Sequence, residues 1–131
     1  MDVRYGGVYL YEPPKASTSE QAAVILTSGS EQSGMRPFII VSRDIVNKNL
    51  PTAVGVPLTS RVHKANAHRI LLPMAELISE PGSGYVFVNS VAMCDHVRVL
   101  DLSLIRKKIG TLSANAMLAV GLGLAFVLDI R

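Results

Sequence analysis

Short apolar runs, separated by residues that interrupt regular structure, most constrain what this chain can fold into. Pro51, Pro73 and the segment Pro81-Gly82-Ser83-Gly84 stand between such runs. Proline cannot donate a backbone hydrogen bond and glycine permits tight turns, so both residue types end strands. The spacing predicts a mainly β fold, a small antiparallel barrel of short strands. The predicted strands cover residues 8–11, 38–42, 52–58, 69–72, 85–93 and about 107–111, with helical turns at 44–49 and 74–78.

The last part of the chain predicts one longer helix. Ser113 is a good N-cap residue, and the stretch 114–128 that follows is apolar nearly all round. A membrane span needs ~20 apolar residues, and this stretch is shorter and contains Gly121 and Gly123. We therefore expect a helix packed on the barrel. An apolar surface on every side could also cover a second subunit, which favours a homodimer.

Length and composition indicate one domain over residues 1–131. The chain has 131 residues, of which 49% are hydrophobic and 18% charged, enough for a real core. The net charge of +3 favours an anionic partner but does not by itself indicate nucleic acid. The start carries Asp2 and Arg4 with no apolar segment after them, so we predict no signal peptide and no membrane anchor. The expected location is the cytoplasm.

The cysteine and histidine content gives no reason to expect a cofactor. Cys94 is the single cysteine and has no disulfide partner in the chain. A nucleophilic thiol is disfavoured, because the carboxylate of Asp95 beside it opposes thiolate formation. The three histidines, at 63, 68 and 96, lack the close spacing of a zinc site. We predict neither a metal nor another cofactor.

Three segments suggest recognition of a phosphate. Gly-Ser-Glu-Gln-Ser-Gly-Met-Arg-Pro at 29–37 places Arg36 where a polar loop enters an apolar strand. The planar guanidinium suits phosphate, and Pro37 favours an extended backbone before it. Alone, such an arginine is usually a solvated surface residue. Pro-Leu-Thr-Ser-Arg at 57–61 and Val-Ala-Met-Cys-Asp-His-Val-Arg at 91–98 follow further apolar runs and strengthen the suggestion.

In order and character, these segments resemble the MazF/PemK family of toxin endoribonucleases, the mRNA interferases of type II toxin–antitoxin systems. The resemblance extends from Tyr-Gly-Gly-Val-Tyr at 5–9 to Ile-Gly-Thr-Leu-Ser at 109–113. It implies the SH3-like, CcdB/PemK-type barrel with a C-terminal helix packed on one side. It also implies a homodimer, single-stranded RNA as substrate, and a cognate antitoxin whose disordered acidic segment folds along the RNA groove.

The resemblance also assigns catalytic residues. Arg36 matches the family's catalytic arginine and Thr59 its catalytic threonine. RNA carries its own nucleophile, the 2′-hydroxyl, so these donors would stabilise the phosphorane without a metal. Glu31 matches an acidic residue of the loop, and Asp95 matches the general base proposed in the PemK branch, although a carboxylate that binds turn amides is an equal alternative. That branch has an arginine two residues before the aspartate, where this chain has Met93, so its acid–base pair is incomplete here.

Other polar residues of the same segments are candidates for RNA contacts. We expect bases of single-stranded RNA to be read by loops. His96 occupies a position that is often glutamine in the family. We favour a base-reading or structural role for it over an acid–base role. Aromatic residues make up only 5% of the chain, so the cleavage sequence cannot be predicted. The predicted RNA-binding residues are Gln32, Ser60, Arg61, His96 and Arg98.

Two questions stay open on the sequence. The loop at about 12–35 is longer than is usual in the family, and it is either a lid over substrate or a tolerated insertion. The fold alone does not exclude a non-catalytic toxin that binds DNA gyrase as CcdB does, or a plain single-strand RNA-binding module. Arg36 and Thr59, both in their family motifs, favour the nuclease.

Overall fold

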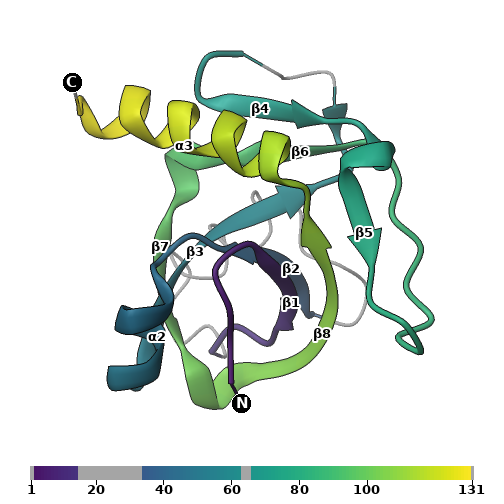
Figure 1. Ribbon diagram of the computed structural model, residues 1–131, viewed down its shortest axis with the longest axis vertical. Helices are drawn as coiled ribbons and strands as arrows, with labels where there is room; N and C mark the ends of the chain where they lie inside the picture. The colour runs from purple at the N-terminus through teal and green to yellow at the C-terminus, as the bar shows by residue number, and fades with distance from the viewer. Residues whose placement is uncertain (1, 15–33, 63–65, 131) are drawn as a thin grey trace.

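The computed structural model describes residues 2–14, 34–62 and 66–130 (Figure 1). Strands dominate, and one long helix ends the chain. The elements in chain order are β1 (Gly7–Tyr11), β2 (Arg36–Ile40), α2 (Asp44–Asn49), β3 (Thr52–Thr59), β4 (Arg69–Leu72), the 3₁₀ turn η2 (Met74–Glu76), β5 (Leu77–Ser79), β6 (Ser90–Met93), η3 (Cys94–His96), β7 (Arg98–Asp101), η4 (Leu102–Leu104), β8 (Ile105–Leu112) and α3 (Ala114–Leu128).

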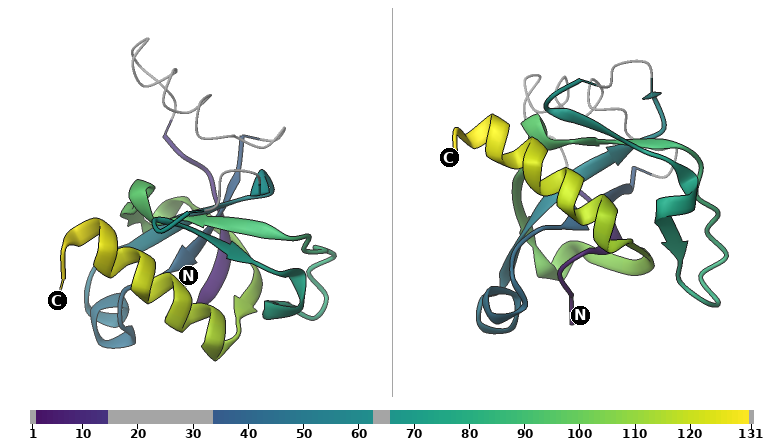
Figure 2. Two further views of the ribbon diagram at one scale, coloured as in Figure 1. Left: turned by 90° about the horizontal axis from the view of Figure 1, so that it is seen from above. Right: turned by 45° about the horizontal axis from the view of Figure 1, so that its top comes forward.

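In the part of the chain that the structure describes, the strands form one curled antiparallel sheet. Its order is β4-β6-β3-β2-β1-β8-β5, and β7 pairs with β3 outside this path. The sheet bends around its own interior, and α3 lies across β4 and β6 on one side (Figure 1; Figure 2). The predicted mainly β fold with a C-terminal helix is therefore confirmed.

Alternate residues of the strands enter two separate cores. In β2, Ile39 packs in a cluster with Val120 of α3, whereas Phe38 and Ile40 pack in a second cluster with Leu100. Successive side chains of a strand point to opposite faces, so each face of the curled sheet has its own apolar filling. The first core holds α3 on the sheet, and the second fills the interior of the curl.

The strand β3 changes neighbours along its length. One of its edges pairs with β2 at Gly55–Pro57. Its other edge pairs with β7 at Thr52–Gly55 and then with β6 at Leu58 and Thr59. Since η3 joins β6 to β7, this short turn packs against β3 at the point where one neighbour replaces the other.

Helix α3 is held through small residues on its inner side. Ser113 caps it, with its Oγ accepting a hydrogen bond of 3.0 Å from the backbone N–H of Ala116. A Cβ at Gly123 would lie 2.8 Å from both Cys94 Sγ and Ile70 Cγ1, so only glycine permits this close approach. In the described residues, no helix has the length and apolar character that a membrane span requires.

Most predicted elements are found, but two predictions are wrong in part and one strand was not predicted. Residues 85–89 form no strand, and β6 begins only at Ser90. A strand at 85–89 would need a free edge of β8 to pair with, and β5 already occupies that edge. Phe87 instead packs its ring against Gly110 of β8. The predicted helical turn at 74–78 divides into η2 and β5. Strand β7 was not predicted, because Arg-Val-Leu-Asp is half charged and forms a strand by pairing with β3.

A buried polar network fixes the connection between β2 and β3. The Ser42 hydroxyl donates to Asn47 Oδ1 at 2.5 Å and accepts from the backbone N–H of Val54 at 2.9 Å. Asn47 Nδ2 in turn donates to the Ser42 carbonyl at 3.0 Å. Both side chains are buried away from water, so their polar groups can be satisfied only by these hydrogen bonds.

We predict that Asn47→Ala lowers the free energy of unfolding by about 1–3 kcal/mol, because it leaves buried polar groups of Ser42 without partners. Asn49→Ala, in the same helix, is the matched control. Asn49 is exposed and only donates to the Ile45 carbonyl, so its loss should change the free energy by about 0.5 kcal/mol or less. Urea unfolding followed by circular dichroism measures both, and equal effects of the two variants would contradict the prediction.

Candidate active site

Two predicted catalytic residues lie at the ends of neighbouring strands. The register pairs Phe38 with Pro57 and Ile40 with Gly55. Arg36 is the first residue of β2 and Thr59 the last residue of β3, so both lie toward the same end of this antiparallel pair. Arg36 shares a strand face with Phe38, two residues further along β2. The Arg36 side chain is deep in the structure, with 3% of the residue exposed.

The turn η3 brings a carboxylate and an imidazole beside these strand ends. Arg69 of β4 binds both oxygens of Asp95, with Nε 3.3 Å from Oδ1 and Nη2 3.1 Å from Oδ2. The same Nη2 lies 3.4 Å from Nε2 of His96. Arg69 reaches the turn from the neighbouring strand, because its register partner on β6 is Met93.

The charges around η3 set the ionisation of both side chains. Partial burial raises the pKa of the Asp95 carboxyl, but the hydrogen bond and charge of Arg69 and the charge of His96 outweigh it, so this pKa lies below its ordinary value. Burial lowers the pKa of His96, Asp95 opposes this, and the charges of Arg69, Arg98 and Arg36 lower it further. His96 is therefore neutral at neutral pH. The influence of Arg36 on His96 links the strand ends to the turn.

Arg98 is a further cation whose charge acts on His96. It pairs with Gly55 at the end of β7, and its guanidinium carbon lies 5.5 Å from the ring centre of Phe38. A cation over an aromatic face is attracted by the electron density of the ring. Phe38 follows Arg36 by two residues on the same strand face, so the ring that Arg98 covers belongs to the strand that carries Arg36.

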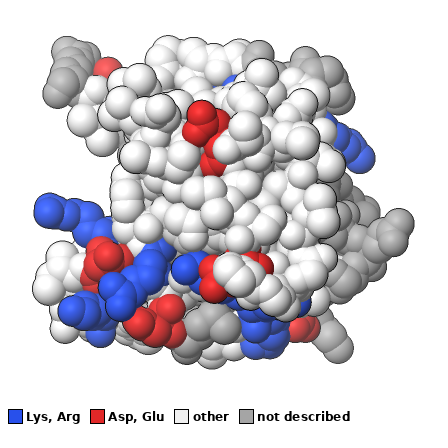
Figure 3. All heavy atoms as spheres, turned by 45° about the vertical axis from the view of Figure 1, so that its right-hand side comes forward, with Lys and Arg blue, Asp and Glu red and all other residues white. Residues whose placement is uncertain are grey.

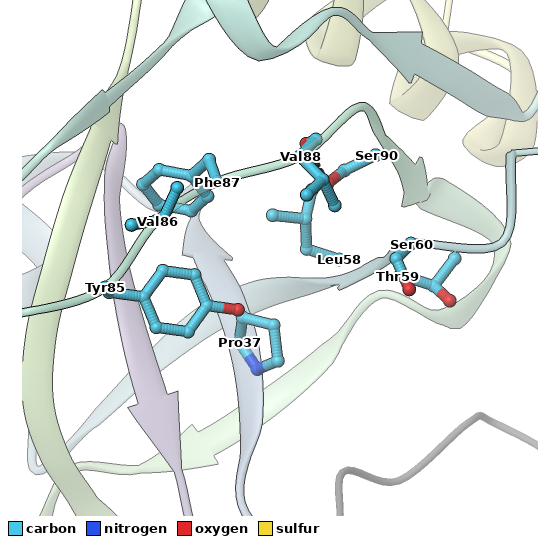
Figure 4. Close-up of a pocket in the computed structure, with 9 residues that line it drawn as sticks. All are labelled: Pro37, Leu58, Thr59, Ser60, Tyr85, Val86, Phe87, Val88 and Ser90. Carbon is cyan, nitrogen blue, oxygen red and sulfur yellow. Dashed lines mark hydrogen bonds between the residues drawn. The ribbon is translucent and has the colours of Figure 1, made fainter.

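A pocket opens beside Thr59 (Figure 4). Its volume is about 220 Å³. Thr59 and Ser60 lie at one end, and the segment around Tyr85 lies at the other, with the Tyr85 ring directed toward Pro37 (Figure 4). The backbone N–H of Arg61 donates to Thr59 Oγ1 at 3.3 Å, which orients this hydroxyl. The lining residues are Pro37, Leu58, Thr59, Ser60, Tyr85, Val86, Phe87, Val88 and Ser90.

The structure joins most of the predicted site and adds residues that the sequence did not indicate. Charge interactions join Arg36, Asp95 and Arg98 to His96, while Thr59 ends β3 and Ser60 and Arg61 continue the chain beyond it. Two groups were missed. Arg69 could be found only from its pairing with Met93, and the 85–88 segment was interpreted as a strand rather than as a pocket wall.

Some predicted residues lie outside the described part of the chain. Glu31 and Gln32 belong to residues 15–33. Their roles stay predictions. The bounds of the long loop, about 12–35, likewise lie mostly outside the described residues.

The overall charge does not by itself mark the site. On the face in Figure 3, Lys and Arg gather along the lower part together with Asp and Glu, and the upper part carries few charges. Mixed charges of this kind largely cancel for a distant anion. The local arrangement of Arg36, Arg69 and Arg98 around His96 is therefore more informative than the net charge of +3.

Two other kinds of chemistry find little support. Cys94 is fully buried, and its Sγ lies 3.7 Å from the Val120 carbonyl oxygen, to which it donates. Burial, with a smaller contribution from the charge of Asp95, raises the pKa of this thiol to about 11, so it is not a thiolate at neutral pH. Among the described residues, no three His, Cys, Asp or Glu side chains gather as a metal site would require.

We predict that Asp95→Asn lowers the free energy of unfolding at neutral pH by about 1 kcal/mol, because the ion pair with Arg69 is partly exposed to solvent. The folded-state pKa of Asp95 is depressed, so its stabilising effect is complete above the unfolded pKa and is lost as the pH falls through the folded one. The difference from the wild type should therefore shrink toward acidic pH.

Urea unfolding at a series of pH values measures this difference. Asp2→Asn is the control, since its ion pair with Arg4 is mostly exposed and should contribute about 0.5 kcal/mol or less. A wild-type advantage over Asp95→Asn that stays constant down to acidic pH would contradict the assignment.

Comparison with known proteins identifies the family. Residues 18–128 match the model of the PemK-like, MazF-like toxin of type II toxin–antitoxin systems. The chain is 33% identical over 89 residues to the endoribonuclease MazF of Staphylococcus saprophyticus, covering 68% of this chain and 69% of that protein.

Solved structures show the same fold. A MazE–MazF structure from Deinococcus radiodurans has a TM-score of 0.69 at 20% identity and covers 100% of both chains. An endoribonuclease in complex with its cognate antitoxin, from a mycobacterial species, has a TM-score of 0.67 at 16% identity, covering 98% of this chain and 97% of that one. With the family model matching most of the sequence, the chain belongs to the PemK-like, MazF-like toxins of type II toxin–antitoxin systems.

Proposed function

We propose that this toxin is a sequence-specific endoribonuclease that cleaves single-stranded mRNA without a metal ion. The observation that carries the proposal is that Arg36 and Thr59 lie toward the same end of the β2–β3 pair, with the charges of Arg36 and Arg98 both acting on His96 of η3. A relative that is 33% identical is named an endoribonuclease. The site combines permanent cations with a hydroxyl donor, which is what a phosphodiester requires when it gains charge.

In the proposed reaction, the 2′-hydroxyl oxygen of RNA attacks the adjacent phosphorus and the bond to the 5′-oxygen breaks. A base removes the proton of the 2′-hydroxyl, an acid protonates the departing 5′-oxygen, and a 2′,3′-cyclic phosphate remains. Arg36 donates to the phosphoryl oxygens as negative charge develops, and the Thr59 hydroxyl donates to the same group. Glu31 and Asp95 are the proposed acid–base candidates.

The RNA would lie across the strand ends. Ser60 and Arg61 follow Thr59 directly and are exposed, so they are placed to meet nucleotides next to the scissile bond. His96 and Arg98 would contact the RNA from η3 and β7, and Gln32 from the long loop. The pocket beside Thr59 has an aromatic wall at Tyr85, against which an unstacked base can pack.

We also propose that two copies associate through α3. The helix exposes large apolar side chains at every fourth position, with Leu118 and Leu122 each 68% and Phe126 63% exposed. A contiguous apolar stripe of this kind is unusual on a monomer. A two-fold axis would set the stripe of one copy against the same stripe of the other and bury both. The proposed toxin is a cytoplasmic homodimer, neutralised by a cognate antitoxin.

We predict that Leu122→Glu shifts the protein from dimer to monomer, because burying unpaired carboxylates in the contact is costly. Ile45→Glu is the control, since Ile45 is similarly exposed, at 63%, but lies on α2. Analytical ultracentrifugation at several concentrations measures the masses. A Leu122→Glu protein that stays dimeric would place the contact elsewhere.

We predict that Arg36→Ala and Thr59→Ala each reduce cleavage of a long unstructured RNA in EDTA by roughly 100-fold or more, the usual effect of removing one donor to a developing charge. Thr52→Ala, at the other end of β3, and Arg106→Ala are the matched controls and should cleave normally. Mapping the fragment ends gives the target sequence.

The alternative functions give different results in the same experiment. An RNA-binding module would bind the RNA, cleave nothing and show no need for Thr59. A toxin like CcdB would leave the RNA intact and inhibit DNA gyrase. Either result with a folded wild-type protein would overturn the nuclease proposal.

A further inference from the structure

We infer that Arg69 is a positioning residue of the site, which holds Asp95 as a carboxylate and fixes His96 as a neutral imidazole with its proton on Nδ1. The assignment of hydrogen-bond roles follows from the geometry around η3. Its consequence for cleavage rests on the proposed nuclease function. No motif of the sequence indicates Arg69, and its position on β4 becomes informative only once β4 is paired with β6.

The first step is the bidentate contact with Asp95. Nε and Nη2 of Arg69 meet the two carboxylate oxygens at 3.3 Å and 3.1 Å. A guanidinium and a carboxylate have matching geometry, so the pair orients both groups. The side chains are only 23% and 29% exposed, which limits competition from water. Asp95 is thereby held ionised, with both oxygens engaged.

The second step concerns the proton of His96. Arginine has only donors, so in a hydrogen bond between its Nη2 and Nε2 of His96, which lie 3.4 Å apart, Nε2 is the acceptor. A neutral imidazole with an accepting Nε2 carries its proton on Nδ1. The distance of 3.6 Å from Nε2 to Asp95 Oδ2 is too long for a hydrogen bond, so Nε2 does not donate to this carboxylate.

The charges that face His96 agree with a neutral ring. Arg69 faces it from β4, Arg98 from β7 and Arg36 from β2, and Asp95 of η3 is the carboxylate among them. Adding a proton to His96 would place a fourth cation in this group, which the remaining charges disfavour. The imidazole is therefore a hydrogen-bond donor through Nδ1 rather than a cation.

The arrangement has a consequence for the proposed reaction. The single lone pair of His96 Nε2 is engaged by Arg69, so the imidazole is not free to take the proton of the 2′-hydroxyl, whereas each Asp95 oxygen keeps acceptor capacity beyond its contact with Arg69. Arg36 and Arg98 are the cations proposed to meet the phosphate. Arg69 thus neutralises the carboxylate of Asp95 within the same group of charges.

Nuclear magnetic resonance of the free toxin tests the inference without RNA. Long-range ¹H–¹⁵N spectra of the imidazole rings distinguish a protonated Nδ1 from a protonated Nε2, and His96→Gln identifies the His96 signals among the three histidines. We expect Nδ1–H in the wild type at neutral pH. In Arg69→Met, Asp95 is free to accept from Nε2–H, so we expect the proton to move to Nε2 and the His96 titration to shift to higher pH.

Arg106→Met is the matched control, because Arg106 also binds a carboxylate, that of Glu12 at 2.9 Å, but on an exposed surface. It should leave the His96 signals unchanged. If Arg69→Met does not fold, Arg69→Lys serves instead, since one ammonium cannot bind both carboxylate oxygens and the ring. A protonated Nε2 in the wild type, or an unchanged proton position in the Arg69 variant, would overturn the inference.

Cleavage kinetics test the consequence separately. With the proton moved to Nε2, we expect kcat of Arg69→Met to fall roughly tenfold, as happens when catalytic groups are displaced slightly. An unchanged kcat despite a moved proton would make the contact purely structural and reject the positioning role. If the wild type cleaves no RNA at all, the nuclease proposal fails while the spectra still decide the state of His96.

Discussion

The change of neighbour along β3 is the constraint on which the rest of the molecule depends. Over its first half β3 pairs with β7, and at its end it pairs with β6. At Gly55 a Cβ would lie 2.5 Å from Leu100 Cδ1 and 3.2 Å from the Phe38 ring, so only glycine lets β2, β3 and β7 meet there. Strands β7 and β6 pair one after the other with the same edge of β3. The η3 turn that joins them must therefore lie against β3.

That constraint also places polar groups between two apolar cores. One core lies under α3 and the other inside the curl of the sheet. The strand ends and η3 lie at the boundary, where Arg36 is almost fully covered and Asp95 and His96 are partly covered. Charges in such surroundings interact more strongly than they do in water, since fewer solvent dipoles screen them. The fold thereby concentrates several arginines around one imidazole despite a small net charge.

The sequence predicted the parts of this arrangement that depend on local residues. Proline and glycine fixed the ends of strands such as β4, and Ser113 fixed the start of α3, because these signals act within a few residues. Arg36 and Thr59 could be selected from motifs. Strand β7 and residues 85–89 were misjudged for a common reason, which is that a strand needs a free edge as well as a suitable composition. β7 has such an edge on β3, whereas β5 occupies the edge of β8.

Arg69 shows the same limit in the chemistry of the site. In the sequence, Met93 stands where the PemK branch has an arginine, so this position offers no cationic partner for the carboxylate of Asp95. Read across the sheet, the register partner of Met93 is Arg69, whose guanidinium binds that carboxylate through both oxygens. In an antiparallel pair, the Cβ atoms of directly opposed residues are only about 4.5–5.5 Å apart, so their side chains interact. A charge that a site requires can therefore be supplied from either strand, and only the register tells which.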